Sequence, residues 1–352
     1  MPLHWPEKLA LAQLPTPLQS LDRLSNRLGG PKIWVKRDDL TGSTLGGNKV
    51  RKLEFTVALA QSKGADLLIT CGGVQSNHCR ATAFVGARLG MPVHLVLRGD
   101  PGPLDGNLLL ASLAGAHVHC YPATQYQQQL NQLLSSWVDH YRRQGYSPHI
   151  IPTGASDAAG LWGYFHAALE IKRDCQAIGL QPDMIVTATG SGGTQAGLTL
   201  GSYYFGLGAS VLGMAVCDDE DYFQRKVSGD IKSFTSEFSK YFKFSDDLES
   251  LAERISIHTN DRYIGEGYGV ASEAVMETIA MVAREEDLLL DPVYTGKAFH
   301  GLLSEIQEGN LSHLKHIIFV HTGGVFSLFP YRKQLQKLLG SNHFYSGSDH
   351  EN

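Results

Sequence analysis

A lysine with basic neighbours follows a pair of glycines near the N-terminus. Gly46 and Gly47 allow a tight turn before Asn48, which stands where a helix N-cap is expected and so places Lys49 in the first turn of that helix. The positive charges of Arg51 and Lys52, together with partial burial, favour the neutral form of the Lys49 amine, which forms Schiff bases with carbonyl compounds. Taken alone, the segment also fits a solvated basic helix start.

A second glycine turn, Cys71–His78, follows an apolar run and opens another predicted helix. Its backbone amides, the Ser76 hydroxyl and the Asn77 amide are expected to converge at the end of that run. Such a nest of donors suits a carboxylate or a phenolate oxygen. The alternatives are an ordinary glycine turn capped by the serine, and a packing role for the histidine.

The most specific motif is the glycine-rich turn Thr189–Gly197. Free backbone amides at a helix start, with serine and threonine hydroxyls beside them, form a phosphate cup. No lysine follows the glycines as in a P-loop, and Gln195 replaces the third glycine of the dinucleotide fingerprint. Asp218, after the next apolar run, still permits a nucleotide-binding alternative because it could mimic a ribose-binding acid.

Two further segments, Asp291–Lys297 and His321–Gly324, each follow an apolar run and carry hydroxyl groups. The glycine-rich loop Gly265–Gly269 adds Tyr268. Each of these segments also fits an ordinary turn with a packed tyrosine. The chain has no HExxH, paired CxxC or GxSxG motif, so metalloprotease, zinc-ribbon and α/β-hydrolase interpretations lack support, and no metal is expected.

Short apolar runs and longer helical patterns must position these turns. The expected strands are Lys32–Lys36, Asp66–Cys71, Val93–Leu97, His117–Tyr121, His149–Ile151, Met184–Ala188, Val211–Val216, Leu288–Leu290 and His316–His321. The expected helices include Lys49–Ser62, Ser76–Leu89, Gln125–Arg143 and Gly160–Ala177. Repeated strand-then-helix units predict an α/β fold with an open, doubly wound, mostly parallel sheet, whose active site lies beyond the carboxyl ends of the strands.

Composition narrows the function classes. A chain of 352 residues predicts about two domains. A net charge of -5 without a long basic run argues against nucleic acid or an anionic membrane as the main partner. Five cysteines without a CxxC pair indicate reduced thiols, and neither a secretory signal nor an apolar run of about 18 residues is present. We therefore expect a cytoplasmic protein, with a polar excursion over Asp218–Asp261 and a disordered tail from Gly340.

The motifs together resemble the fold-type-II enzymes dependent on pyridoxal 5′-phosphate (PLP) that comprise D-cysteine desulfhydrase and 1-aminocyclopropane-1-carboxylate (ACC) deaminase. The matching segments, in the family's order, are Lys36–Leu40, Gly46–Glu54, Gln75–His78, Thr189–Thr194, Asp291–Lys297 and His321–Gly324. They span nearly the whole chain. The resemblance implies a homodimer in which a large domain, residues 1–52 and 161–352, receives an inserted small α/β domain, residues 53–160.

The resemblance also implies roles for individual residues. Lys49 would carry the cofactor as a Schiff base, and Asn77 would bond its phenolic oxygen. The residues that would hold the phosphate are Gly190, Ser191, Gly192, Gly193 and Thr194. The groups expected around the small amino-acid substrate are Gln75, Ser76 and Asn77 at its carboxylate, with Ser76 assisting proton movement, and Tyr268 and Tyr294 as active-site phenols.

Thr295 and Thr322 distinguish branches of this family. ACC deaminases typically carry glutamate and leucine at these positions, and a glutamate beside the pyridine nitrogen keeps that nitrogen protonated. A threonine hydroxyl gives a weaker electron sink, which suffices when thiolate leaves. The pattern therefore favours α,β-elimination of D-cysteine to pyruvate, ammonia and sulfide over ACC deamination, and it leaves L-cysteate sulfo-lyase open.

Two alternatives come from other classes. A nucleotide-binding oxidoreductase would use the 189–197 turn and Asp218, but it leaves the Gly46–Lys49 segment without a purpose. A catalytically silent binding protein on the same fold is hard to reconcile with an intact Lys49.

Overall fold

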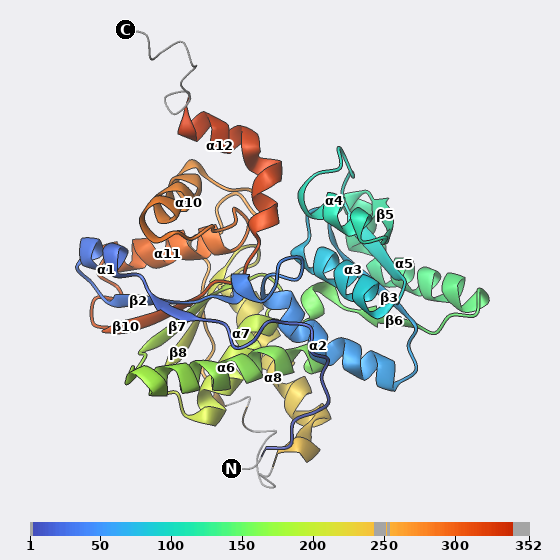
Figure 1. Cartoon of the computed structure of the whole chain (residues 1–352), viewed down its shortest axis with the longest axis horizontal. Coiled ribbons are helices and arrows are strands. Elements are labelled where there is room, and N and C mark those ends of the chain that lie inside the picture. The colour runs from blue at the N-terminus through green and yellow to red at the C-terminus, as the bar shows by residue number, and fades with distance from the viewer. Residues whose placement is uncertain (1–2, 243–250, 252–253, 341–352) are drawn as a thin grey trace.

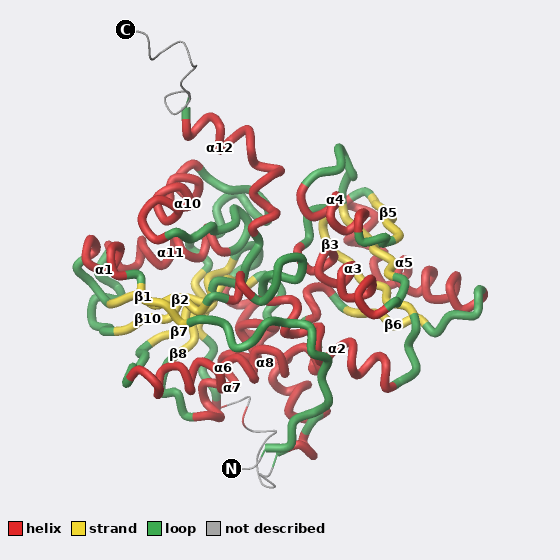
Figure 2. Tube along the Cα trace, in the orientation of Figure 1, coloured by secondary structure: helices red, strands yellow, loops and turns green. Residues whose placement is uncertain are grey.

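Two open sheets organise the chain (Figures 1 and 2). The computed structural model describes residues 3–242, 251 and 254–340. The larger sheet has the order β1 (Leu18–Ser20), β2 (Lys32–Lys36), β10 (His316–Val320), β7 (Met184–Thr189), β8 (Ser210–Ala215) and β9 (His258–Asn260). Its pairs are parallel except for β1 with β2.

The second sheet is entirely parallel. Its order is β5 (His117–Tyr121), β4 (Val93–Arg98), β3 (Leu67–Gly73) and β6 (Pro148–Ile151). Gly73 pairs with Arg98 in the last register position, so both residues lie at the same edge of this sheet. The predicted α/β class with mostly parallel sheets is confirmed, whereas the domain limits at residues 53 and 160 stay a prediction.

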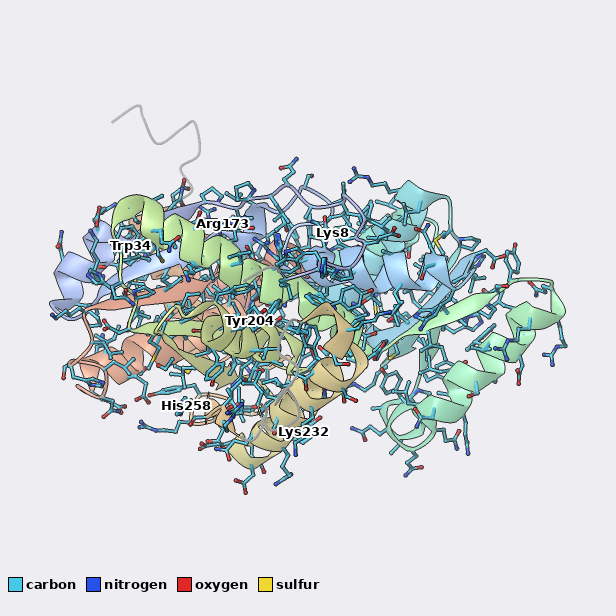
Figure 3. The ribbon with its side chains drawn as sticks, turned by 90° about the horizontal axis from the view of Figure 1, so that it is seen from below. Lys8, Trp34, Arg173, Tyr204, Lys232 and His258 are labelled. Carbon is cyan, nitrogen blue, oxygen red and sulfur yellow. The ribbon has the colours of Figure 1, made fainter. Side chains whose placement is uncertain are left out.

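Helices surround the sheets (Figure 1). They are α1 (Asp22–Leu28), α2 (Asn48–Ser62), α3 (Asn77–Leu89), α4 (Gly106–Leu113), α5 (Ala123–Arg143), α6 (Ala158–Ile178), α7 (Gly193–Phe205), α8 (Glu220–Glu237), α10 (Glu273–Glu286), α11 (Thr295–Gln307) and α12 (Arg332–Leu339). In Figure 3, which views the molecule from below, α6 lies on the near side with Arg173 labelled on it. No helix of the described residues is long and apolar enough to cross a membrane.

The strand β10 shows why the apolar runs are continuous. Ile317 and Phe319 belong to one buried apolar cluster, and Ile318 and Val320 belong to another. Successive side chains of a strand point to opposite faces, so a strand covered on both faces must be apolar at every position. This burial holds the following loop, His321–Gly324, at the carboxyl edge of the sheet.

The structure corrects three details of the predicted elements. Leu288–Leu290 is not a strand: Leu288 and Leu290 are buried while Leu289 is 52% exposed, but the segment pairs with no described strand. The short strands β1 and β9 were not predicted, because three residues give too little pattern. Asn48 is the first residue of α2, and Gly47 takes the N-cap position instead.

Part of the excursion over Asp218–Asp261 is helical, since α8 occupies Glu220–Glu237. The predicted disordered tail lies almost wholly outside the described residues. All five cysteines are free thiols in the structure, as their number and spacing predicted.

Candidate functional site

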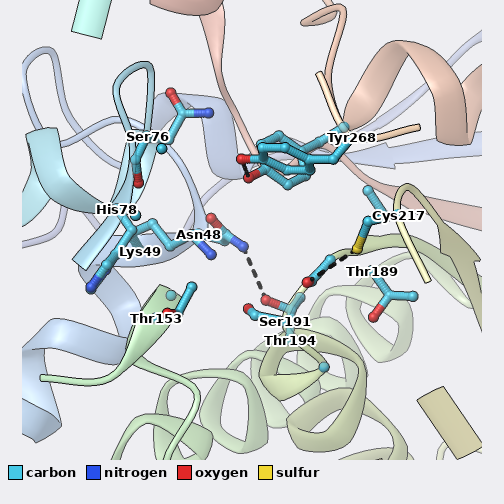
Figure 4. Close-up of a pocket in the computed structure, with 18 of the residues that line it drawn as sticks. Asn48, Lys49, Ser76, His78, Thr153, Thr189, Ser191, Thr194, Cys217 and Tyr268 are labelled. Atoms are coloured by element: carbon cyan, nitrogen blue, oxygen red, sulfur yellow. Dashed lines mark hydrogen bonds between the residues drawn. The ribbon is translucent and has the colours of Figure 1, made fainter. Parts of the chain in front are cut away.

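A cavity of about 390 Å³ lies where the carboxyl ends of strands from both sheets face each other (Figure 4). The predicted residues that line it are Lys49, Ser76, Asn77, Gly190, Ser191, Gly192, Thr194, Tyr268, Tyr294 and Thr322. Gln75, Gly193 and Thr295 are not part of the lining. Segments separated by more than 200 residues in the sequence therefore meet at one site, as the positions of the turns predicted.

The start of α2 is fixed by close backbone packing. Gly47 has φ +114°, and a Cβ added there would lie 2.7 Å from the carbonyl oxygen of Thr322. The same carbonyl accepts a hydrogen bond from the Asn48 amide at 3.0 Å. Only glycine permits this approach, and the contact holds Lys49 at the cavity wall.

Lys49 is half-buried, and no described group donates to or accepts from its amine. Burial lowers the pKa of Lys49 to about 8. A substantial fraction of the amine is therefore neutral near physiological pH, which is the form that attacks a carbonyl carbon.

The Thr153–Gly154 turn, which the sequence analysis did not single out, also lines the cavity. Gly154 has φ +71°, and a Cβ there would lie 2.5 Å from Ser191 Oγ and 3.2 Å from Lys49 Nζ. The absence of a side chain thus leaves room for the lysine amine. The available signal was the position of this turn directly after the strand β6, like that of the other site turns.

The Ser76 turn forms as predicted. Ser76 Oγ caps α3 by accepting a hydrogen bond from the Cys79 amide at 3.2 Å. Asn77 Oδ1 accepts from Asn107 Nδ2 at 2.9 Å and from Ser327 Oγ at 3.4 Å. These bonds fix the amide so that Asn77 Nδ2 remains as a donor, which suits an anionic oxygen.

Gln75 and His78 serve the surrounding structure. Gln75 Oε1 accepts from the Asn107 amide at 2.9 Å, which ties the turn to α4. Thr70 Oγ1 donates to the Ile151 carbonyl at 2.8 Å, so it must accept from His78 Nε2 at 2.7 Å. Burial, followed by the charges of the nearby lysines, holds the pKa of His78 well below its usual range. His78 is therefore neutral, as a hydrogen-bonding histidine.

The 189–197 turn forms the predicted cup at the start of α7. Asn48 Nδ2 donates to Thr194 Oγ1 at 3.0 Å (Figure 4). The hydroxyls of Ser156 and Ser191 are bonded at 2.8 Å. A Cβ at Gly193 would lie 2.6 Å from Ser156 Oγ and 3.0 Å from Lys52 Nζ. The glycine therefore leaves the first-turn amides of α7 open to an anion.

Lys52 places a buried amine behind this cup, a role that the sequence analysis did not assign to it. Its Nζ donates to the Gly154 carbonyl and to Ser156 Oγ, both at 3.2 Å. No carboxylate of the described residues lies within ion-pair distance of Lys52, and Asp230 is bonded to Lys226 at 2.5 Å. Burial, followed by the charge of Lys49, lowers the pKa of Lys52 well below its usual value. The lowered pKa favours the neutral amine, and an anion in the cup would raise that pKa and stabilise the ammonium form of Lys52.

Two tyrosines form the opposite wall. The hydroxyls of Tyr268 and Tyr294 are 2.5 Å apart, and their rings meet edge to face (Figure 4). A Cβ at Gly190 would lie 3.1 Å from Tyr294 Cε1, so the glycine turn also makes room for this ring. Burial raises the pKa of both phenols, which therefore stay neutral at physiological pH.

Thr295 is buried beside the cavity rather than in its wall. Its Oγ1 donates to Asp291 Oδ1 at 2.8 Å and accepts from the Asp291 amide at 2.7 Å. Burial raises the pKa of Asp291 to about 6 although several backbone amides bond to it. Thr322, by contrast, lines the cavity and is 8% exposed.

Comparisons with known proteins agree with this geometry. Residues 9–323 match the family model described as pyridoxal-phosphate dependent enzyme. The bifunctional D-cysteine desulfhydrase/1-aminocyclopropane-1-carboxylate deaminase, mitochondrial, of Arabidopsis thaliana is 40% identical over 345 residues, which cover 94% of this chain and 82% of that protein. A D-cysteine desulfhydrase of Salmonella newport is 39% identical and covers 94% of this chain and 99% of its own.

Solved structures give the same result. The structure of an ACC deaminase homologue superposes with a TM-score of 0.83 at 35% identity, covering 94% of this chain and 96% of that chain. O-ureido-L-serine synthase superposes with a TM-score of 0.64 at 16% identity, covering 95% of each chain, and shares the fold.

Proposed function

Because the chain belongs to the pyridoxal-phosphate dependent enzyme family, we propose that it eliminates the β-substituent of D-cysteine or a similar amino acid. The products are pyruvate, ammonia and sulfide. One observation carries the proposal: the Lys49 amine lies in the same cavity as a glycine cup backed by the buried Lys52 amine. The family match over residues 9–323 overrules the nucleotide-binding oxidoreductase alternative.

The residues of the cavity fit the cofactor. Lys49 Nζ would hold its aldehyde carbon, the cup at residues 190–194 with Lys52 would hold its phosphate, and Asn77 Nδ2 would bond its phenolic oxygen. When bound, the cofactor supplies an electron sink that stabilises negative charge at the substrate Cα.

The remaining groups of this site bind the substrate and move its protons. Ser76 and the Asn77 backbone amide, at the start of α3, would bind the substrate carboxylate. Lys49, released as a neutral amine, would take the Cα proton because its lowered pKa matches that task. The neutral phenols of Tyr268 and Tyr294 would face the substrate and donate hydrogen bonds to it.

Two threonines support elimination over opening of a cyclopropane ring. Neither Thr295 nor Thr322 supplies a carboxylate to the pyridine nitrogen, and of the two Thr322 lines the cavity. ACC deamination is the second candidate, favoured by the 35% identity to the ACC deaminase homologue and by the bifunctional relative from Arabidopsis thaliana. L-cysteate sulfo-lyase activity stays open, because the two threonines do not exclude it.

The first test is an absorption spectrum from about 300 to 500 nm before and after borohydride, with the variants Lys49→Ala and Lys63→Ala. We expect a visible band that borohydride bleaches in the wild type and in Lys63→Ala, because Lys63 is an exposed lysine at the other end of α2. Lys49→Ala should lack the band. Sulfide release from D-cysteine and α-ketobutyrate release from ACC then compare the two candidates. A wild type that stays colourless with added PLP contradicts the proposal.

The homodimer and the cytoplasmic location remain predictions, and the Arabidopsis thaliana relative is named as mitochondrial. Light scattering of the purified protein measures the oligomeric state directly. A mass of about 38.4 kDa would mean a monomer and contradict the predicted homodimer.

A further inference from the structure

One arginine enters the cavity from the second sheet. Arg98 is the last residue of β4 and is half-buried. Among the described residues that line the cavity, Arg98 is the arginine and Lys49 is the lysine. Its register partner Gly73 also lines the cavity, so Arg98 reaches the cavity from the carboxyl edge of the second sheet.

No anionic side chain in the described part of the protein neutralises Arg98. Among the described residues its guanidinium makes no hydrogen bond and no ion pair; it lies over the rings of Tyr268 and Tyr126, 5.6 Å and 6.0 Å from their centroids. Arg51, which is fully buried, bonds by contrast to the carboxylates of Asp38 and Glu170. The aromatic contacts hold the guanidinium plane and leave its five N–H donors for a ligand.

We propose that Arg98 makes the site selective for amino acids whose β-substituent is anionic, a thiolate or a sulfonate. The inference rests on the proposed elimination and names its substrate class. Ser76 and the start of α3 serve the α-carboxylate, whereas Arg98 contacts Tyr268, whose hydroxyl is bonded to Tyr294. The site therefore offers two separate places for negative charge.

The same cation serves the chemistry. The Cα–H bond breaks and its proton passes to Lys49, while the electron pair forms the Cα–Cβ double bond. The Cβ–S bond breaks and its electron pair leaves with sulfur. The thiolate of cysteine leaves as hydrogen sulfide ion, with the proton that Lys49 took from Cα, and the sulfonate of 3-sulfoalanine leaves as sulfite. One water then converts the released aminoacrylate to pyruvate and ammonia. Arg98 stabilises the charge that gathers on the departing sulfur group.

The test compares 3-sulfoalanine with 3-chloroalanine, whose β-substituent is neutral, each as both enantiomers, by pyruvate formation on the PLP-loaded enzyme. We expect Arg98→Met to lower kcat/KM for 3-sulfoalanine roughly 10-fold to 100-fold more than for 3-chloroalanine, because a charge-assisted bond is lost. Arg98→Lys keeps the charge without the planar group and should fall between. The control Arg262→Met removes an arginine that also lies over a tyrosine, Tyr263, but outside the cavity, and should change neither value.

Each outcome decides the matter. Equal losses for both substrates in Arg98→Met, or no loss, overturn the inference and leave elimination in place; equal losses would assign Arg98 to the α-carboxylate. The inference is also overturned, with elimination left in place, if the wild type forms pyruvate from 3-chloroalanine but from neither 3-sulfoalanine nor D-cysteine. A wild type that forms pyruvate from none of these substrates overturns the proposed function instead. The cofactor absorption band shows that each variant is folded, and Arg98→Lys provides the comparison if Arg98→Met loses that band.

Discussion

Asn48 Nδ2 donates a hydrogen bond to Thr194 Oγ1 at 3.0 Å and so joins the helix that carries Lys49 to the glycine cup (Figure 4). The two groups that hold opposite ends of the cofactor in our proposal are thereby set at a fixed spacing. This bond also explains why Asn48 is not the N-cap of α2: its side chain reaches across to α7, and Gly47 takes the cap position.

Removing this bond should weaken cofactor binding without removing the site. We expect Asn48→Ala to raise the dissociation constant of PLP about fivefold, which corresponds to a net loss of about 1 kcal/mol for one hydrogen bond. Titration of the apoenzyme followed by absorbance measures it. Asn131→Ala, at an exposed position of α5, is the matched control. An unchanged constant would mean that the spacing is set by the backbone alone.

Lys52 should contribute to binding of the cofactor phosphate and not to the stability of the fold. In Lys52→Met the dissociation constant of PLP should rise roughly 10-fold to 100-fold, because a charge-assisted contact to the phosphate is lost. Binding of pyridoxal, which lacks the phosphate, should change far less. Urea unfolding of the apoenzyme should show no loss of stability, since a buried amine without a counter-ion is replaced by an apolar chain. A destabilised apoenzyme with unchanged PLP affinity would assign Lys52 to the core instead.

The rate at which apoenzyme takes up PLP should depend on pH through Lys49. Burial lowers the pKa of this amine to about 8, so below pH 8 most of it is protonated and unreactive. The rate should rise about tenfold per pH unit below the midpoint and level off above it. Stopped-flow absorbance between pH 6 and 10 follows it. A rise that continues to pH 10 would show that the amine keeps the pKa of an exposed lysine.

Exchanging the two threonines should redirect the reaction. Thr295→Glu with Thr322→Leu places a carboxylate where ACC deaminases carry one, and we expect α-ketobutyrate from ACC together with a lower rate on D-cysteine. Thr295 now bonds to Asp291, whose pKa burial raises to about 6. The new glutamate should therefore keep Asp291 protonated, because two adjacent carboxylates resist joint ionisation. A double variant without α-ketobutyrate shows that further residues decide the branch.

The carboxyl-end turns were predictable because each follows a buried parallel strand and begins with glycine or a helix cap. Ser76 and the 189–197 cup illustrate this, since strand, turn and helix stand in sequence order. Lys52 and Gly154 were harder to find, because their roles depend on Gly193 and Ser191, which approach them only in the folded chain. The three Leu288–Leu290 side chains alternate between core and surface as in a strand, but the pattern carries no information about pairing.

The close approach of Gly47 to Thr322 has a consequence for how the protein is made. Gly47 and Asn48, which fix Lys49, dock on a carbonyl that is added to the chain more than 270 residues later. A ribosome-bound chain that ends before residue 322 therefore lacks the surface that orients the lysine, even after the second sheet has folded. Stable cofactor loading must therefore wait until residue 322 has been added, and chains that stop before it should be released without cofactor.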